Sequence, residues 1–378
     1  MPARLGLRRR PGPLVLPCPA AGGIEVVAPP LKPLAQAPGI GQVGSVKNTQ
    51  NIAIIGAGLA GLTAAAYLRA GYEGEIVIFD KGRRPGGRLA ARRHQGVLFN
   101  HGAQFATARN PRFLAWLQAR VADGRAALWP ETSINHDRYV GLPDMNALAD
   151  APISAVETGR HVSFAEQQGG QWYLYVNDAK LVAPGHVGPT GSRIGPFDRL
   201  ILALPAPQAA AFLAGIGHYF AEPASIVTMA PCWTVMLGFP PGTAGPDILL
   251  PAHSPLSWVA REACRPGNRD ASVGYTVQAS PAWSRAHLED DAQAVQDMLA
   301  REFIALSGVA ADPDFTATHR WRYAQSEISL GVPCLWDEER NLGVCGDWCM
   351  GNRLESAFCS GVGMAEAILA HTSMSVRG

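Results

Sequence analysis

The sequence predicts an α/β fold in which a domain built on a parallel sheet is interrupted by an inserted α+β domain. Two observations predict it. A buried strand, a glycine turn, a helix and a second strand follow one another within residues 51–80, and this is the repeating unit of parallel sheets. Beyond about residue 223 the pattern changes to strand-like pieces and an amphipathic helix, and buried-strand character returns at 342–346. The expected division is 51–222 and 325–373 for the discontinuous first domain, and 223–324 for the inserted domain, with 105–150 as a candidate addition to it.

The residue types in 51–80 predict the strands and the helix of the first unit. Residues 51–55 are apolar on both faces, as in a central parallel strand. Residues 59–70 are rich in Ala and Leu and predict a helix that Gly71 ends. Residues 75–79 form the second strand, so the unit is a right-handed βαβ crossover. Further along, the pattern predicts helices over 110–123, 288–306 and 361–371, and strands over 171–176, 198–204, 232–239, 272–278 and 342–346.

Composition excludes several classes of function. The chain has 378 residues, 47% of them hydrophobic and 17% charged, which suits two domains with large cores. The net charge is +1 and no basic stripe is visible, so we expect no nucleic-acid partner. No run of about 18 apolar residues is present, so we expect no membrane partner.

The seven cysteines predict neither a metal site nor a disulfide framework. Their number is odd, and the closest pair, Cys345 and Cys349, has three residues between its members and no matching second pair. We therefore expect no metal, reduced thiols and a cytoplasmic location.

Residues 1–50 are expected to be a disordered leader and are set aside from the fold. Arg8, Arg9 and Arg10 are similar to a twin-arginine signal, but prolines interrupt the apolar segment that such a signal needs. A transit peptide and residues upstream of the natural start remain alternatives. The leader also contains a G-x-G-x-x-G match at 39–44, which has neither a strand before it nor a helix after it, and we interpret it as a linker.

The match at 56–61 has the context that gives this motif its meaning. Gly56 allows the tight turn after the strand, Gly58 lets the backbone approach a pyrophosphate, and Gly61 lets the helix pack on the sheet. The intervening Ala57, Leu59 and Ala60 complete the loop and the helix N-terminus, whose free N–H groups favour phosphates. Asp80 ends the second strand and is placed to accept the hydroxyls of an adenosine ribose. The alternative is a structural turn that binds nothing.

By spacing alone, the segment after Asp80 is either a loop of donors for the long backbone of FAD or a solvated basic turn. Lys81 opens a basic loop that ends in Gly86, Gly87 and Arg88, and this loop resembles the GGR motif of the amine-oxidase-like flavoprotein superfamily. The resemblance implies a flavin beside Gln104 and Phe105, a ribityl chain bound by Gly346 and Asp347, and a helix N-terminus facing the flavin. Further cofactor contacts that it implies are Val162, Leu354, Glu355, Ser356 and Ala357.

Within that superfamily the chain resembles the renalases, especially the bacterial ones, over residues 51–372. The resemblance implies non-covalent FAD and oxidation of 2- and 6-dihydro isomers of NAD(P) to NAD(P)+, with O2 reduced to H2O2. Covalent attachment through Cys345 or Cys349 is an alternative, although neither cysteine matches the attachment position of the amine oxidases. The similar stretches are FDKGRRPGGR (79–88), HGAQFATAR (101–109), LALPAPQAA (202–210), SPLSWVAR (254–261), WSRAHLE (283–289), HRWRYAQ (319–325) and CGDWCMGNRLESAFCSG (345–361).

Substrate residues are expected on the inserted domain. A dihydronicotinamide already carries a hydride, so the protein has only to stack the ring, exclude water and orient the amide. Trp321 and Tyr323, with Trp233 and Trp258, are candidates for an aromatic wall, although core packing is the alternative for each. Gln278 stands where the family tends to have a histidine, and it can bind an amide but cannot take up a proton at neutral pH. Substrate phosphates and surface carboxylates are alternative partners for Arg261, Arg320 and Arg322.

Two other functions compete. The first is an amine oxidase or a desaturating flavoenzyme acting on a small metabolite. Amine oxidases of the superfamily place a lysine near the flavin in the later half of the chain, whereas the last lysine here is Lys180. The second is a non-catalytic flavin-binding redox sensor.

Overall fold

The computed structural model describes residues 50–132, 136–149, 156–183, 185–268 and 273–375. The glycine match at 39–44, Cys18 and all of the expected leader except Gln50 lie outside the described residues.

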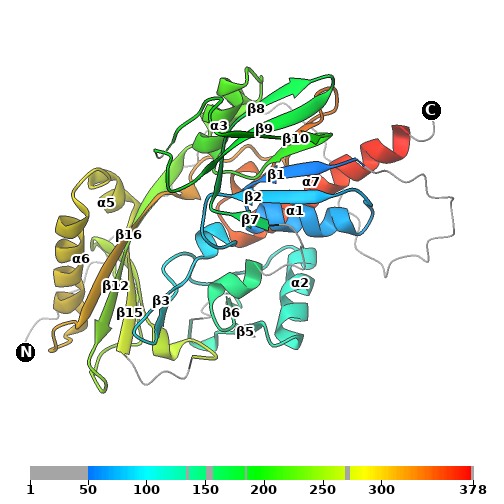
Figure 1. Cartoon of the computed structure of the whole chain (residues 1–378). Coiled ribbons are helices and arrows are strands. Elements are labelled where there is room, and N and C mark those ends of the chain that lie inside the picture. Colours follow the sequence, from blue (N-terminus) through cyan, green and yellow to red (C-terminus); the bar gives the residue numbers. More distant parts are fainter. Residues whose placement is uncertain (1–49, 133–135, 150–155, 184, 269–272, 376–378) are drawn as a thin grey trace, which may run out of the picture. The chain divides into compact units, whose positions relative to one another are not determined.

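A six-stranded sheet carries the βαβ unit (Figure 1). Its strand order is β17-β18-β11-β1-β2-β7, and β1 pairs in parallel with both β11 and β2. The chain crosses to opposite sides of β1, so a crevice opens at the carboxyl end of that strand, where ligands of such sheets bind. The bounds are β1 Ile52–Ile55, β2 Ile76–Asp80, β7 Val156–Thr158, β11 Arg199–Leu202, β17 Leu335–Asp337 and β18 Leu342–Val344.

The alternation of side chains along β1 separates two hydrophobic cores. Ile52 and Ile54 face a core formed with α1 (Leu59–Arg69) and α7 (Leu354–Ser375). Ala53 and Ile55 face the opposite core, formed with the sheet β10-β9-β8 and with α3 (Ala206–Gly215). Both faces of β1 are therefore covered, as predicted for a central parallel strand. This small sheet contains β8 Arg160–Gln168, β9 Gln171–Asp178 and β10 Ser192–Phe197, and α4 (Ala221–Ile226) follows α3.

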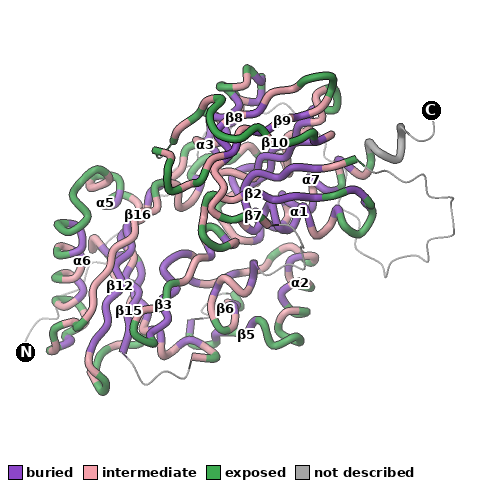
Figure 2. The backbone as a smooth tube through the Cα atoms, viewed as in Figure 1, coloured by how far each residue is buried: buried purple, intermediate pink, exposed green. Residues whose placement is uncertain are grey.

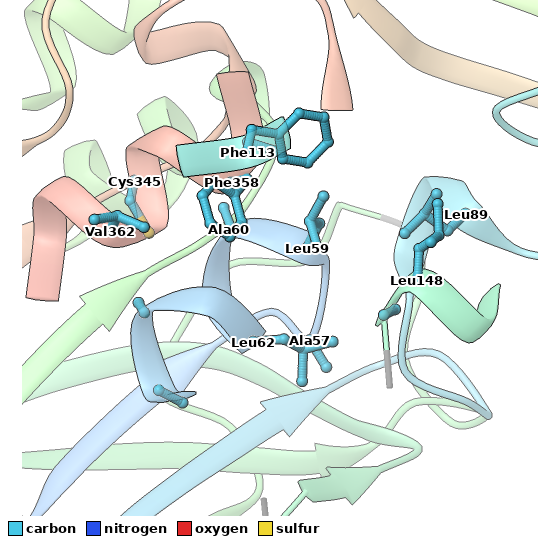
Figure 3. Packing of buried hydrophobic residues seen from close by; sticks show 14 of the residues in the cluster. Ala57, Leu59, Ala60, Leu62, Leu89, Phe113, Leu148, Cys345, Phe358 and Val362 are labelled. Carbon is cyan, nitrogen blue, oxygen red and sulfur yellow. The ribbon is translucent and has the colours of Figure 1, made fainter. Parts of the chain in front are cut away.

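The last helix begins earlier than predicted. It spans Leu354–Ser375, so residues 354–357 form its first turn instead of preceding it. Gly361, the predicted first residue of the helix, lies inside it and allows close packing, because a Cβ there would clash with the carbonyl oxygen of Ala60. Figure 3 shows Ala60 of α1 beside Phe358 and Val362 of α7.

A five-stranded antiparallel sheet, in the order β13-β14-β15-β12-β16, forms the inserted segment. Helix α6 (Ala292–Ser307) packs on it through Val295, Leu299 and Phe303, and Figure 2 shows exposed stretches alternating with less exposed ones along this helix. The helix begins after the predicted residue 288 because the Asp291 side chain accepts from the N–H groups of residues 293 and 294 and caps it. The other bounds are β12 Met229–Phe239, β13 Ile248–Leu249, β14 Leu256–Arg261, β15 Val273–Ala279, α5 Pro281–Ala286 and β16 Phe315–Ser326.

Short elements link the sheets. They are η1 Gly87–Leu89, β3 Arg92–His94, β4 Val97–Phe99, α2 Pro111–Ala122, β5 Ala126–Leu128, η2 Pro130–Thr132, β6 Tyr139–Gly141, η3 Met145–Ala149, η4 Glu262–Cys264 and η5 Asp347–Cys349. Among the residues described, no helix has the length and hydropathy needed to cross a membrane. The same residues contain no cluster of three or more His, Cys, Asp or Glu side chains suited to a metal ion, and the six cysteines among them are free thiols.

Candidate functional site

The glycine turn leaves room for a ligand at one of its three glycines. Gly56 has φ +110°, and a Cβ there would lie 2.5 Å from the carbonyl oxygen of Ala203. A Cβ on Gly61 would lie 2.2 Å from the carbonyl oxygen of Gly56. A Cβ on Gly58, in contrast, would meet nothing within 4 Å, and Gly58 caps α1 without a side-chain hydrogen bond. The fold therefore requires Gly56 and Gly61, whereas Gly58 keeps the first N–H groups of α1 open to a phosphate.

Asp80 braces the glycine turn. One carboxylate oxygen accepts from the N–H of Ala57 at 2.6 Å, and the other accepts from the N–H of Gly82 at 2.6 Å. The N–H of Gly86 donates to the carbonyl of Ala57 at 2.7 Å, which ties the GGR loop to the same turn. Asp80 thus holds two loops together, and its contact with a ribose stays a prediction.

Arg88 and Asp347 form the charged centre of the site. Nη2 of Arg88 lies 2.6 Å from Oδ1 of Asp347, and Nη1 lies 2.8 Å from Oδ2. Nη1 also donates to the carbonyl of Ala324 at 3.0 Å. Burial alone would lower the pKa of Arg88, but the Asp347 carboxylate outweighs it and raises that pKa above its ordinary value.

A cavity of about 420 Å³ lies between the glycine turn, the loop 102–105, β16 and the start of α7. This volume is in the range of small-molecule and cofactor sites. The predicted site residues among its lining are Gly58, Leu59, Ala60, Arg88, Gln104, Phe105, Gln278, Trp321, Gly346, Asp347, Leu354 and Ala357. The structure therefore gathers residues of the glycine turn, the GGR loop, the inserted segment and the C-terminal segment around one space.

The remaining predicted site residues do not line this cavity. Val162 is buried in the core beneath the small sheet. Lys81 has a lowered pKa because burial outweighs the opposing effect of Asp80. The others outside the lining are Gly56, Ala57, Gly61, Asp80, Gly87, Tyr323, Glu355 and Ser356.

Glu355 contacts the backbone of a neighbouring helix start. It is 5% exposed, and its carboxylate accepts short hydrogen bonds from the N–H groups of Arg109 and Asn110. Arg353 pairs with its other oxygen. Since Asn110 caps α2, Glu355 joins the first turn of α7 to the start of α2 and fixes the orientation of Leu354 and Ala357 in the cavity wall.

Two side chains of the inserted segment enter the wall through hydrogen bonds to one loop. Nε1 of Trp321 donates to the carbonyl of His101 at 2.9 Å. Nε2 of Gln278 donates to the carbonyl of Gly102 at 2.8 Å. Because a carbonyl can only accept, this contact assigns the amide nitrogen of Gln278 to the loop and leaves Oε1 as the acceptor.

Of the other aromatic and basic candidates, Trp258 lines the cavity, whereas Trp233 lies in the core and the arginines form ion pairs. Trp258 lines the cavity and packs 5.4 Å from Phe105, measured between ring centroids. Trp233 is a core residue whose Nε1 donates to the carbonyl of His287. The three arginines considered for substrate phosphates form ion pairs with carboxylates, Arg261 with Asp247, and Arg320 and Arg322 with Glu289.

Sequence reasoning assigned no role to several other lining residues. Asn352 and Arg353 lie within the renalase-like stretch 345–361, so that resemblance was an available signal. Cys232, Ser257 and Pro281 come from three elements of the inserted segment, and only the tertiary fold brings them together.

The fold and this turn define a protein with a Rossmann-like dinucleotide-binding domain. Residues 54–119 match the family model described as an NAD(P)-binding Rossmann-like domain. The match covers the turn, α1, β2 and the loop that carries Arg88.

Solved structures share the wider architecture. A provisionally named protoporphyrinogen oxidase from Exiguobacterium sp. 255-15 has a TM-score of 0.63 and 11% identity, covering 85% of this chain and 99% of that one. A triple and a double mutant of putrescine oxidase, made in a redesign of its cofactor binding, have TM-scores of 0.55 and 0.52 with 13% and 12% identity. Each match covers 85% of this chain and 99% of the mutant. At these identities the similarity establishes the fold, a Rossmann-like domain with an additional domain.

Proposed function

We propose that the protein is an FAD-dependent oxidase that converts 2- and 6-dihydro isomers of NAD(P) to NAD(P)+ and reduces O2 to H2O2. The observation that carries the proposal is the composition of the cavity. One side of the cavity is formed by the glycine turn, the Arg88–Asp347 pair and the first turn of α7. The other side carries Trp321 and Gln278. In this division, residues 51–222 and 325–373 bind FAD and residues 223–324 provide the substrate domain.

The residues present fit an elongated dinucleotide. The space beside Gly58 and the uncapped start of α1 suit a pyrophosphate. Asp347 lies in the lining, where its carboxylate would accept from ribityl hydroxyls while it stays paired with Arg88. The first turn of α7 places Leu354 and Ala357 where a helix N-terminus stabilises negative charge. Bound FAD would supply the acceptor for a hydride and pass both electrons to O2.

The chain itself has to bind and orient the substrate. Overall, dihydroNAD(P), O2 and one proton give NAD(P)+ and H2O2, and the reaction needs no side-chain base because the hydride is already on the ring. The Trp321 indole would stack on the dihydronicotinamide, since its N–H is held by His101 and its orientation is fixed. Gln278 Oε1 would accept from the substrate carboxamide, since Nε2 is occupied by Gly102.

Anaerobic stopped-flow measurement tests the proposal. The FAD-loaded protein is mixed with 6-dihydroNAD(P), with ordinary 4-dihydro NADH or with amines, and flavin bleaching is followed. We expect the isomer to reduce the flavin fastest by far. If the isomers do not reduce the flavin but a diamine bleaches it, the proposal is wrong and an amine oxidase is the better assignment. One of the structural neighbours is a putrescine oxidase.

Substitutions of Trp321 and of a control tryptophan test the proposed aromatic wall of the cavity. Trp321→Leu removes the stacking surface and is expected to lower the reduction rate at least ~10-fold. Trp283→Leu is the matched control, because Trp283 stacks on His287 and is absent from the cavity lining. Equal losses in the two variants would remove Trp321 from the proposed mechanism.

A further inference from the structure

A buried ion pair stands behind the loop that forms one wall of the cavity. Glu262 and Arg265 lie in and directly after η4, and their side chains are 1% and 4% exposed. Nε of Arg265 is 2.8 Å from Oε2 of Glu262, at ion-pair distance but without the alignment of a hydrogen bond. Neither residue lines the cavity.

Glu262 holds the start of the loop. Oε1 accepts from the backbone N–H of Asn100 at 2.9 Å, and Oε2 accepts from its side-chain Nδ2 at 2.9 Å. The hydroxyl of Thr276 donates a short hydrogen bond to Oε1. Asn100 in turn accepts from the N–H of Met145 at 2.8 Å through Oδ1. The carboxylate therefore fixes both the backbone and the side chain of Asn100.

Arg265 holds the other end of the loop. Nη1 donates to the backbone carbonyl of Gln104 at 2.7 Å, and Nη2 donates to its side-chain Oε1. Nε2 of Gln104 then donates back to the carbonyls of Asn100 at 2.6 Å and Gly102 at 2.9 Å. One ion pair thus closes a ring of hydrogen bonds around residues 100–104.

We propose that Glu262 and Arg265 are positioning residues that set the loop 100–105 relative to the cofactor and the substrate. Gly102, Gln104 and Phe105 face the cavity from this loop. Its carbonyl groups also anchor the two substrate-side residues, because Trp321 binds to His101 and Gln278 binds to Gly102. This inference rests on the proposed function, because it takes the cavity to be the binding site of FAD and of the substrate.

A purely structural role explains the pair less well. Burying two charges contributes little to stability, because desolvation offsets their attraction, and apolar residues of similar volume are often as stable. Apolar residues, however, cannot fix the peptide groups of a polar loop. The five hydrogen bonds that Glu262 and Arg265 make to Asn100, Gln104 and Thr276 define one loop position, and a displacement of about 1 Å at such a site is enough to slow a reaction strongly.

The test compares Arg265→Met and Arg265→Lys with Asp337→Asn in the full-length, FAD-loaded protein. Asp337 forms the matched control pair, since His218 and Asp337 are buried at 0% and 8% side-chain exposure and do not line the cavity. Measurements are the thermal midpoint, the Kd for FAD, the absorption maxima of the bound flavin and the stopped-flow rate at saturating isomer. The flavin spectrum requires no substrate turnover, so it reports on the loop even if the isomers prove not to be substrates.

We expect Arg265→Met to shift the flavin maxima and to lower the rate at saturating substrate at least ~10-fold, while the Kd for FAD changes less than ~3-fold. Arg265→Lys keeps the charge next to Glu262 but loses the forked contact with Gln104, so partial recovery is expected. Asp337→Asn should lower the thermal midpoint and leave spectrum and rate unchanged. The proposal is overturned if the Arg265 variants lower only the thermal midpoint. It is likewise overturned if Arg265→Met fails to fold and Arg265→Lys folds with an unchanged spectrum and rate.

Discussion

Arg88 and Asp347 are separated by 259 positions in the chain, yet they meet in a two-point ion pair inside the cavity. Asp347 is 6% exposed at its side chain and Arg88 is 30% exposed. The pair joins the loop after β2 to the segment after β18, and so it connects the two ends of the predicted discontinuous domain.

Asp347→Asn should weaken both folding and FAD binding. The amide cannot present two acceptor oxygens, so Arg88 loses one contact and its charge partner. Because Arg88 is partly solvated, we expect a loss of about 1–3 kcal/mol in urea denaturation, less than for a fully buried pair. Glu289→Gln, which breaks an exposed ion pair with Arg322, is the control and should leave the free energy of unfolding almost unchanged, because solvent screens such a pair. An unchanged Kd for FAD in Asp347→Asn would exclude Asp347 from the cofactor site.

Alanine substitutions at Gly61 and Gly58 should have opposite effects, one on stability and the other on FAD affinity. Gly61→Ala forces a Cβ against the carbonyl of Gly56 and should lower the free energy of unfolding by about 1–3 kcal/mol. Gly58→Ala puts its Cβ into open space, so stability should hold while FAD affinity falls at least ~10-fold. Urea denaturation of the FAD-free proteins and FAD titration separate the two effects. A Gly58→Ala protein that binds FAD normally would show that no phosphate lies against this residue.

His101 should make the protein acid-sensitive. Burial, and then the neighbouring His319, lower the pKa of His101 from 6.5 to about 4. Between these values the unfolded chain takes up a proton that the folded protein does not, so stability falls as the pH falls from about 6.5 toward 4. From pH 7 to pH 5 this group accounts for a loss of about 2 kcal/mol.

His101→Gln should remove that part of the pH dependence, as measured by urea denaturation at both pH values. His136→Gln, at an exposed position, serves as the control and should follow the parent protein. Parallel pH profiles for the His101→Gln and parent proteins would contradict the assignment.

Glu355→Gln tests whether Glu355 acts on the cofactor or on the protein. Its carboxylate binds the N–H groups that start α2, so the weaker acceptor should cost about 1–3 kcal/mol of stability. Since Glu355 does not line the cavity, we expect the Kd for FAD to change less than ~3-fold. Glu366→Gln, which breaks an exposed ion pair between α7 and Arg112 of α2, is the control and should leave the Kd for FAD unchanged. A large loss of FAD affinity at unchanged stability would show that Glu355 contacts the cofactor.

The parts of the fold that the sequence predicts are those determined locally. The strand, turn and helix at 51–70 follow from apolar runs and glycines within a few residues of one another, and β9, β11, β12 and β15 were predicted on similar grounds. The boundary of α7 was not predictable in this way. Gly361 lowers the helix propensity of this stretch. Glycine is needed there because the carbonyl of Ala60 in α1, far away in the sequence, leaves no room for a Cβ.

The same distinction applies to the site. Gly58 and Arg88 belong to motifs that can be recognised from a short stretch of sequence, and both line the cavity. The Glu262–Arg265 pair has no such signal, because its partners Asn100 and Gln104 come from a different part of the chain. Gln278 was recognised as a departure from a family pattern, but its contact with Gly102 could not be inferred without the tertiary structure.

The packing of α1 against α7 has a consequence for biosynthesis. The glycine turn and α1 emerge early from the ribosome, but β18, Asp347 and the first turn of α7 are translated nearly 300 residues later. Until then one side of the cavity is missing and the apolar face of α1 that meets Phe358 and Val362 is uncovered. The nascent chain is therefore expected to need protection of this surface during translation, and to acquire its cofactor only after synthesis has passed residue 357.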